Sequence, residues 1–429
     1  HKEYRRQRQM CIRDRTRGGC LGARYSISGR VFNGLCSGII EYSLLFLILS
    51  LLVGKGTYLL SLYLLGTGLI LKLFVAKSDL VFPGIVRFFV FIFIMIWLWG
   101  ILPNQAATWE SGSALIWFVC ILFGIFQVKR IILFPIGLEK ILGLLLVYFV
   151  LINCSAALLY GENVSFRNGY KGLFKNIHFL SEYAVMLAPA LVYKTIYSSV
   201  KGRFVYGISL MGDIGLILAS LSRPGYISAI CSVLVLMPFL TPRFRLSSLS
   251  LLSMVLAVIY WGNISRFRER IDDLILNITA DERAPIWRDF FLMQGDSTTL
   301  QWLFGHGLGQ FVLDFHERAM FSPRLLFLSP HNFFFEVLYS HGFLGFVMVS
   351  SIFCFLYQVL VQAIKREKND LTRHQGLVLL ATLTALILHC FFTMPFFSRD
   401  FLLPLSLVTG FILLYCQDVE RNYPKVTLG

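Results

Sequence analysis

The sequence predicts an all-α polytopic membrane protein, and three observations lead to this prediction. Among its 429 residues, 56% are hydrophobic and 15% are charged, and the mean hydropathy is +0.70, which is unusual for a soluble globular chain. Apolar runs separated by short polar segments recur along nearly the whole chain, and most could cross a hydrocarbon core of about 30 Å as helices. The runs are continuously apolar and do not alternate, which favours helices over half-buried strands.

We expect about twelve spans, a number set by the length that a helix needs to cross the bilayer. The expected spans are residues 39–54, 57–76, 83–102, 113–128, 141–160, 178–197, 204–221, 225–240, 247–261, 335–360, 375–394 and 400–416. One long polar segment interrupts this pattern. The chain therefore divides into a basic arm (1–38), transmembrane helices (39–261), a polar loop with short interfacial helices (262–334), further transmembrane helices (335–417) and a tail (418–429).

The positive charges predict the orientation of these spans. The net charge is +15, and the Lys and Arg residues gather in the arm and in alternate connectors, which the positive-inside bias places in the cytoplasm. These connectors are residues 129–140, 194–203, 242–245 and 365–374. Both termini should then be cytoplasmic, and the long polar loop should face outward. This bias explains the basic arm better than nucleic-acid binding does, and residues 7–15 of the arm, which resemble translated sequencing-adapter sequence, are assigned no function.

One outward loop departs from the charge bias. Residues 161–177 carry Arg167, Lys171 and Lys175 on the side where few cations are expected. Cations placed against the bias indicate an anion-binding role for this loop.

Cysteine and histidine spacing does not suggest a metal site. The chain has nine cysteines, no CxxC pair, and most of its cysteines lie inside apolar runs, which argues against a disulfide framework and a metal–thiolate site. No HxxxH or HExxH spacing occurs either. Histidine chemistry, if present, is then expected to be acid–base catalysis by a single imidazole.

The best candidate for such chemistry is His331, in the stretch PHNFFFEVLYSHGFLG that runs from Pro330 to Gly345. A proline ends the polar loop just before a new apolar helix, so His331 and Asn332 are expected at the boundary between water and membrane. Gly342 and Gly345 are three residues apart and should leave one face of the helix open to close packing.

Two arginines are candidates for binding an anion. Arg223 stands between two apolar helices with almost no loop, and a charge so near hydrocarbon is functional more often than incidental. Arg283 precedes Pro285 near an expected helix start, where backbone N–H groups help to hold an anion. Ile286, Phe290 and Phe291 recur there at helical spacing, which predicts a short amphipathic helix on the membrane surface. For Arg223 the alternative is snorkelling to the outer interface, which is the less favoured interpretation. By itself, Arg283 would be interpreted as part of the solvated face of an interfacial helix.

These motifs together resemble the bacterial O-antigen ligases, a family that belongs to one superfamily with the O-antigen and exopolysaccharide polymerases. His331-Asn332, nine residues, then Gly342-x-x-Gly345 is similar to the signature of the family. Ser222-Arg223 resembles its Ser-Arg-Gly, with Pro224 in place of the usual small residue. Further similarities are Arg283-x-x-x-Trp287, the glycine-rich step from Gly305 to Phe311, and the loop segment Gly172 to Asn176, from which His178 departs. The likeness covers roughly residues 160–350, in the order of the family.

The resemblance implies a metal-independent, inverting glycosyltransferase of the GT-C-like type, without a cofactor, in the bacterial inner membrane. The donor would be a glycan on undecaprenyl pyrophosphate and the acceptor the lipid A–core oligosaccharide, both reached from the periplasmic side. His331 would be the general base, and Arg223 and Arg283 would hold the pyrophosphate, because guanidinium groups bind phosphate bidentately and stay charged. Supporting positions are Asn332, Glu336, Lys175, Gly342 and Gly345.

Two alternatives remain open at the level of the sequence. A polysaccharide polymerase would use the same donor at the same site and differ only in the acceptor. A lipid or ion transporter would use Asp213 and Glu182, two acids inside apolar helices, as proton-path residues. The transporter interpretation leaves the ordered motifs unexplained.

Overall fold

The computed structural model describes residues 35–51, 58–75, 83–101, 108–128, 137–159, 170–174, 176–239, 283–322, 330–393 and 396–423. A first helix covers Leu35–Leu51. It is followed by α2 (Tyr58–Val75), α3 (Gly84–Ile101), α4 (Thr108–Val128), α5 (Gly137–Leu159), α6 (Ile177–Tyr197), α7 (Val200–Ala219), α8 (Arg223–Leu234) and the 3₁₀ turn η3 (Met237–Phe239). The remaining helices are α11 (Arg283–Gly295), α12 (Thr299–Phe304), α13 (Gln310–Arg318), α14 (Phe333–Arg366), α15 (Asp370–Phe391) and α16 (Arg399–Asn422). In these ranges all regular secondary structure is helical.

The helices lie where the apolar runs predict them. Each expected span coincides with a helix, except the span at 247–261, which lies outside the described residues. Within the described ranges, five helices are long and apolar enough to cross a membrane: α3, α7, α14, α15 and α16. The all-α fold with several apolar spans is therefore confirmed, whereas the total number of spans stays a prediction.

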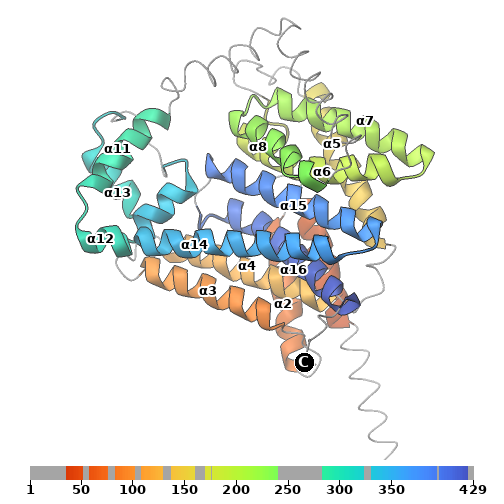
Figure 1. Ribbon diagram of the computed structural model, residues 1–429, viewed down its shortest axis with the longest axis horizontal. Coiled ribbons are helices and arrows are strands. Elements are labelled where there is room, and N and C mark those ends of the chain that lie inside the picture. Colours follow the sequence, from red (N-terminus) through yellow and green to blue (C-terminus); the bar gives the residue numbers. More distant parts are fainter. Residues whose placement is uncertain are drawn as a thin grey trace, which may run out of the picture.

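The helices form a layered bundle with a small outer cap. Figure 1 shows α14 and α15 side by side, with α6, α7 and α8 on one side, α3 and α4 on the other, and α11, α12 and α13 gathered at one end. The main hydrophobic core joins α2 to α8 with α14 to α16. A second core is formed by α11, α13 and the first part of α14, around Phe290, Phe311 and Tyr339.

The second core changes the expected role of α11. Its apolar residues Ile286 and Phe290 are fully buried, and the Phe290 ring stacks on Phe335 of α14 at 4.7 Å. Asp289 is buried beside them and accepts backbone N–H groups from Met320 and Ser322, each at 2.9 Å. The helix predicted at this position is present. Its Ile286 and Phe290 side chains pack against protein, whereas Phe291 is 59% exposed.

The start of α14 also differs from the expected smooth helix. Gly342 has φ 68° and ψ −171°, so α14 breaks at this residue, and the glycine lies in close contact with the backbone of Leu303 at the end of α12. The backbone of the segment 305–308 also approaches the break: His306 N–H donates to the Tyr339 carbonyl at 2.8 Å and Gly307 N–H to Ser340 at 2.9 Å. Carbonyls in the last turn of a helix lack intrahelical donors. The glycine-rich segment supplies those donors and holds the two halves of α14 in place.

Candidate functional site

The candidate site begins at the residue that precedes α14. Asn332 is 2% exposed, and its side chain accepts the N–H groups of Phe334 at 3.0 Å and Phe335 at 3.2 Å, which makes it the N-cap of α14. Asn332 is therefore buried in the helix start and does not lie at an open water boundary. His331, just outside the cap, is half-buried.

His331 has a strained backbone. Its φ is 51°, in the left-handed region that residues other than glycine rarely adopt. Among the described residues, Leu221, with φ 53°, is the other non-glycine residue with positive φ. It lies two residues before Arg223. Such strain costs of order 1–3 kcal/mol per residue and concentrates at functional sites. One strained residue is thus His331 itself, and the other lies close to Arg223, and the sequence singles out both His331 and Arg223.

Helix α11, which begins at Arg283, is bonded to the segment that precedes His331. Arg283 is the first residue of α11, and Trp287 follows one turn later on the same face. The Trp287 indole N–H donates to the Pro330 carbonyl at 3.0 Å, and its ring packs edge-on against Phe335 at 5.7 Å. Pro330 directly precedes His331, so this hydrogen bond ties the helix that carries Arg283 to the segment that carries His331.

Arg223 is held at the start of α8 by contacts with α6. Ser222 is the N-cap residue, but its side chain makes no cap hydrogen bond. Its Oγ lies instead 3.1 Å from Nδ1 of His178 on α6. Gly225 packs against the Ser181 hydroxyl so closely that a Cβ at residue 225 would collide with it. His178, at which the sequence departs from the family's loop segment, therefore orients the chain just before Arg223.

Helix α15 connects this pair of helices to α11. Ser181 of α6 lies 3.1 Å from Nε2 of His389 on α15, and both residues are fully buried. The Trp287 ring of α11 lies 6.4 Å from the ring of Phe392, the residue that caps the C-terminus of α15, and this contact places α11 near the same end of α15. A continuous series of contacts thus joins the starts of α8, α11 and α14, and Arg223, Arg283 and His331 share this end of the bundle.

The side chain of Glu336 binds the backbone of another segment of the chain. Its Oε2 accepts the backbone N–H of Phe396 at 2.7 Å, which fastens the turn before α16 to the first turn of α14. Gly342 and Gly345 belong to the break in α14, and Lys175 lies outside the described residues. The supporting positions that can be described therefore shape and anchor α14.

A buried group on α6 and α15 has the composition of a metal site. Ligand atoms of Glu182, His389 and Cys390 lie within 4.8 Å of one another. The Cys390 thiol donates to Glu182 Oε1 at 3.6 Å, and the two His389 nitrogens lie 3.1 Å from Ser181 Oγ and 3.4 Å from Thr393 Oγ1. One oxygen, one nitrogen and one sulfur ligand would suit zinc. The hydrogen bonds within the group account for its arrangement as a link between the two helices.

The two acids of the transporter hypothesis lie apart from each other. Glu182 contacts Cys390 of α15, as described above. Asp213 is fully buried on α7, and its neighbour Gly212 faces Val150 and Cys154 of α5. The described residues thus place the two acids on different helix pairs, and the proton path stays a prediction without structural support.

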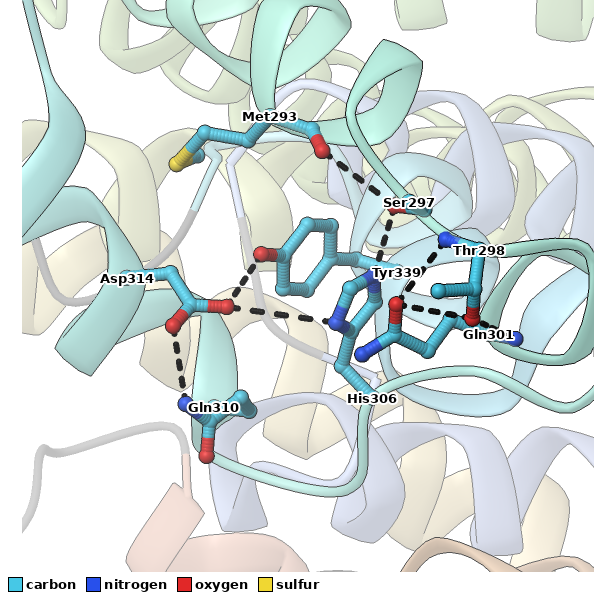
Figure 2. A network of polar contacts seen from close by, with 8 residues as sticks. All are labelled: Met293, Ser297, Thr298, Gln301, His306, Gln310, Asp314 and Tyr339. Carbon is cyan, nitrogen blue, oxygen red and sulfur yellow. Dashed lines mark hydrogen bonds and ion pairs between the residues drawn. The ribbon is translucent and has the colours of Figure 1, made fainter.

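A second polar network lies in the outer cap, under the glycine-rich segment. Figure 2 shows His306 stacked on Tyr339, with both side chains directed at Asp314 of α13. The Tyr339 hydroxyl donates to Asp314 Oδ2, and Gln310 donates to Oδ1 at 2.8 Å. His306 Nε2 lies 2.8 Å from the Ser297 hydroxyl, and His306 Nδ1 lies 4.0 Å from Asp314. These contacts hold α11, α13 and α14 together beside the break in α14.

Acid should weaken this cap. Burial lowers the pKa of His306, Asp314 opposes the shift, and Arg318 adds to it. The unfolded chain, with an ordinary His pKa of about 6.5, then binds a proton more readily than the folded cap does. The free energy of unfolding should therefore fall as the pH falls below that ordinary pKa. Thermal unfolding of the wild type and of His306→Gln at several pH values measures this dependence. A wild-type stability that changes with pH as little as that of the variant would contradict the prediction.

The comparison with protein families matches the central part of the chain. Residues 208–350 match the family model described as O-antigen ligase. This part of the chain is similar to the O-antigen ligases. The resemblance noted in the sequence is thereby supported by an independent comparison, and the match together with the apolar helices indicates a membrane protein. A search of curated proteins found no match to the chain.

The matched region contains part of the candidate site. Arg223, Arg283 and His331 lie inside residues 208–350, whereas His178 and His389 lie on α6 and α15, outside the match. The sequence analysis did not find the contact of His178 with Ser222 or that of His389 with Ser181. The local signal was available only for His178, where the loop segment departs from the family pattern. No local pattern pairs residue 389 with residue 181, because the two are distant in sequence.

Proposed function

We propose that this protein is an O-antigen ligase that transfers a glycan from undecaprenyl pyrophosphate to the lipid A–core oligosaccharide. The observation that supports this proposal best is the hydrogen bond from Trp287 to Pro330, at 3.0 Å, because it couples the arginine-bearing helix to His331. The family match supports the reaction class. The acceptor and the location in the bacterial inner membrane, with the site on the periplasmic side and both termini in the cytoplasm, are part of the proposal.

The proposed mechanism assigns one role to each group. An acceptor hydroxyl attacks the anomeric carbon of the donor glycan, and the bond from that carbon to the pyrophosphate oxygen breaks with inversion. His331 takes the proton of the hydroxyl, a step to which a positioned imidazole is suited. Arg223 and Arg283 neutralise the charge that develops on the departing polyprenyl pyrophosphate. Arginine suits this task because it stays protonated and binds phosphate oxygens in pairs.

A transfer assay with purified protein in lipid tests the proposal. The protein is mixed with a lipid-linked glycan, with and without lipid A–core, and the products are separated on a gel. A product that requires lipid A–core is the expected result. Lengthening of the glycan with donor alone would instead make the protein a polymerase with the same site. Absence of transfer with competent donors would contradict the enzyme assignment.

The arginine roles are tested in the same assay with a matched pair of variants. Arg283→Ala should lower transfer strongly, while Arg288→Ala, on the exposed side of the same helix where Arg288 covers the Phe321 ring, should change it little. Equal losses in the two variants would show that a positive charge on α11 matters only in a general way.

A further inference from the structure

Helix α12 (Thr299–Phe304) exposes an unusual amount of apolar surface for part of a polar loop. Leu300 is 70% exposed, Trp302 43% and Phe304 45%. The six residues of α12, TLQWLF, contain no charged side chain. Exposed apolar groups that are contiguous mark contact surfaces for protein or membrane.

The apolar surface of α12 continues onto two candidate membrane spans. The Trp302 ring stacks on Phe343 of α14 at 5.8 Å, and the Phe304 ring packs against Trp99 of α3 at 5.6 Å. On α14, Phe343 is 41% and Val347 41% exposed, and α3 and α14 both qualify as spans. Figure 1 shows α12 beside the ends of α3 and α14. The exposed residues of α12 thus extend the surface that these spans present to lipid.

The backbone of α12 is unusually well satisfied at both ends. Thr298 and Gln301 form a reciprocal capping box, in which the Gln301 side chain accepts Thr298 N–H at 2.9 Å. At the other end, Trp99 donates its indole N–H to the Phe304 carbonyl at 2.9 Å, and Gly305 N–H bonds to the Gln301 carbonyl at 2.7 Å. Internal pairing of backbone groups is the condition for placing a segment out of contact with water.

We infer that α12 is inserted into the membrane interface and that its exposed face is covered by the acyl chains of bilayer phospholipids. Trp99 and Trp302 then lie at the level typical of interfacial aromatic residues. On α11, Ile286 and Phe290 are instead buried in the outer cap, and the next residue, Phe291, is 59% exposed beside them.

The insertion has a consequence for the site. The chain passes directly from α12 into Gly305–Leu308, which is hydrogen-bonded to Tyr339 and Ser340 of α14 and, through Leu308 N–H at 2.7 Å, to the Gly100 carbonyl of α3. A helix fixed at the interface therefore fixes the depth of the break in α14 and of the residues before it. This inference does not depend on the proposed transfer reaction.

Quenching of tryptophan fluorescence by brominated phospholipids tests the inference. The full chain is placed in nanodiscs with ordinary lipids or with lipids brominated in the upper acyl chain. The quenched signal should be lower in Trp302→Phe than in the wild type, because Trp302 contributes part of it. Trp287→Phe is the matched control, since Trp287 is packed between Phe335 and Phe392 and should not contact lipid.

A second pair of variants tests the position of the helix directly. Leu300→Asp should draw α12 out of the interface and reduce the quenching of Trp302, whereas Leu313→Asp, on α13 with Leu313 49% exposed, should leave it unchanged. If brominated lipid does not quench Trp302 in the wild type, then protein or water covers α12 and the inference is overturned. The inference also fails if Leu300→Asp leaves the quenching intact.

Discussion

His331→Ala and His331→Gly should both lose glycan transfer, by about 10²–10⁴-fold if the imidazole is the general base. The two variants should differ in stability. Residue 331 has φ 51°, a conformation that glycine adopts freely but that costs an alanine roughly 1 kcal/mol. The glycine variant should therefore unfold at the higher temperature. Transfer assays and thermal unfolding of the purified variants in the same lipid measure the two effects.

The paired variants separate chemistry from backbone conformation, because both lack the imidazole. Wild-type transfer by His331→Ala would show that the base assignment is wrong. Equal unfolding temperatures of the two variants would contradict the strained conformation and leave the base assignment untouched.

Gly342→Ala should destabilise the protein by more than about 3 kcal/mol, at the severe end of single substitutions. A Cβ at residue 342 would lie 2.5 Å from the backbone nitrogen of Gly305 and would also collide with the Leu303 carbonyl group, and the φ of 68° disfavours any side chain. Backbone atoms cannot move aside as a flexible side chain does. Thermal unfolding and the yield of monodisperse protein report the loss.

Gly215→Ala on α7 is the matched control for this substitution. A Cβ at residue 215 meets nothing within 4 Å, and alanine stabilises a helix interior relative to glycine by up to about 1 kcal/mol. If Gly342→Ala were tolerated as well as Gly215→Ala, the contact between the glycine-rich segment and the break in α14 would be contradicted.

The positions of the helices were predictable because a membrane helix must carry a continuous apolar run. The predicted span 178–197 corresponds to α6 (Ile177–Tyr197), and the predicted span 83–102 to α3 (Gly84–Ile101). The length and hydrophobicity of such a run are local properties, set by the thickness of the bilayer. The same holds for the family motifs, which are read from consecutive residues and are supported by the family match over residues 208–350.

The functions of individual polar residues were less predictable. Glu336 was expected as a supporting residue of the site, and its side chain accepts the N–H of Phe396, sixty residues away in sequence. Asn332 was expected at an open boundary but is buried as a helix cap. In both cases the partner is a backbone N–H group, which every residue except proline offers. The identity of the side chain therefore does not reveal which partner it finds.

By itself the sequence determined an all-α membrane protein and the order of its motifs, because both depend on the types and spacing of neighbouring residues. Only the tertiary structure decided that α11 buries Ile286 and Phe290 in the outer cap while α12 exposes Leu300, Trp302 and Phe304. It also decided that α14 breaks at Gly342, where the segment 305–308 supplies the missing donors. These outcomes depend on contacts between residues far apart in the chain, which no local pattern encodes.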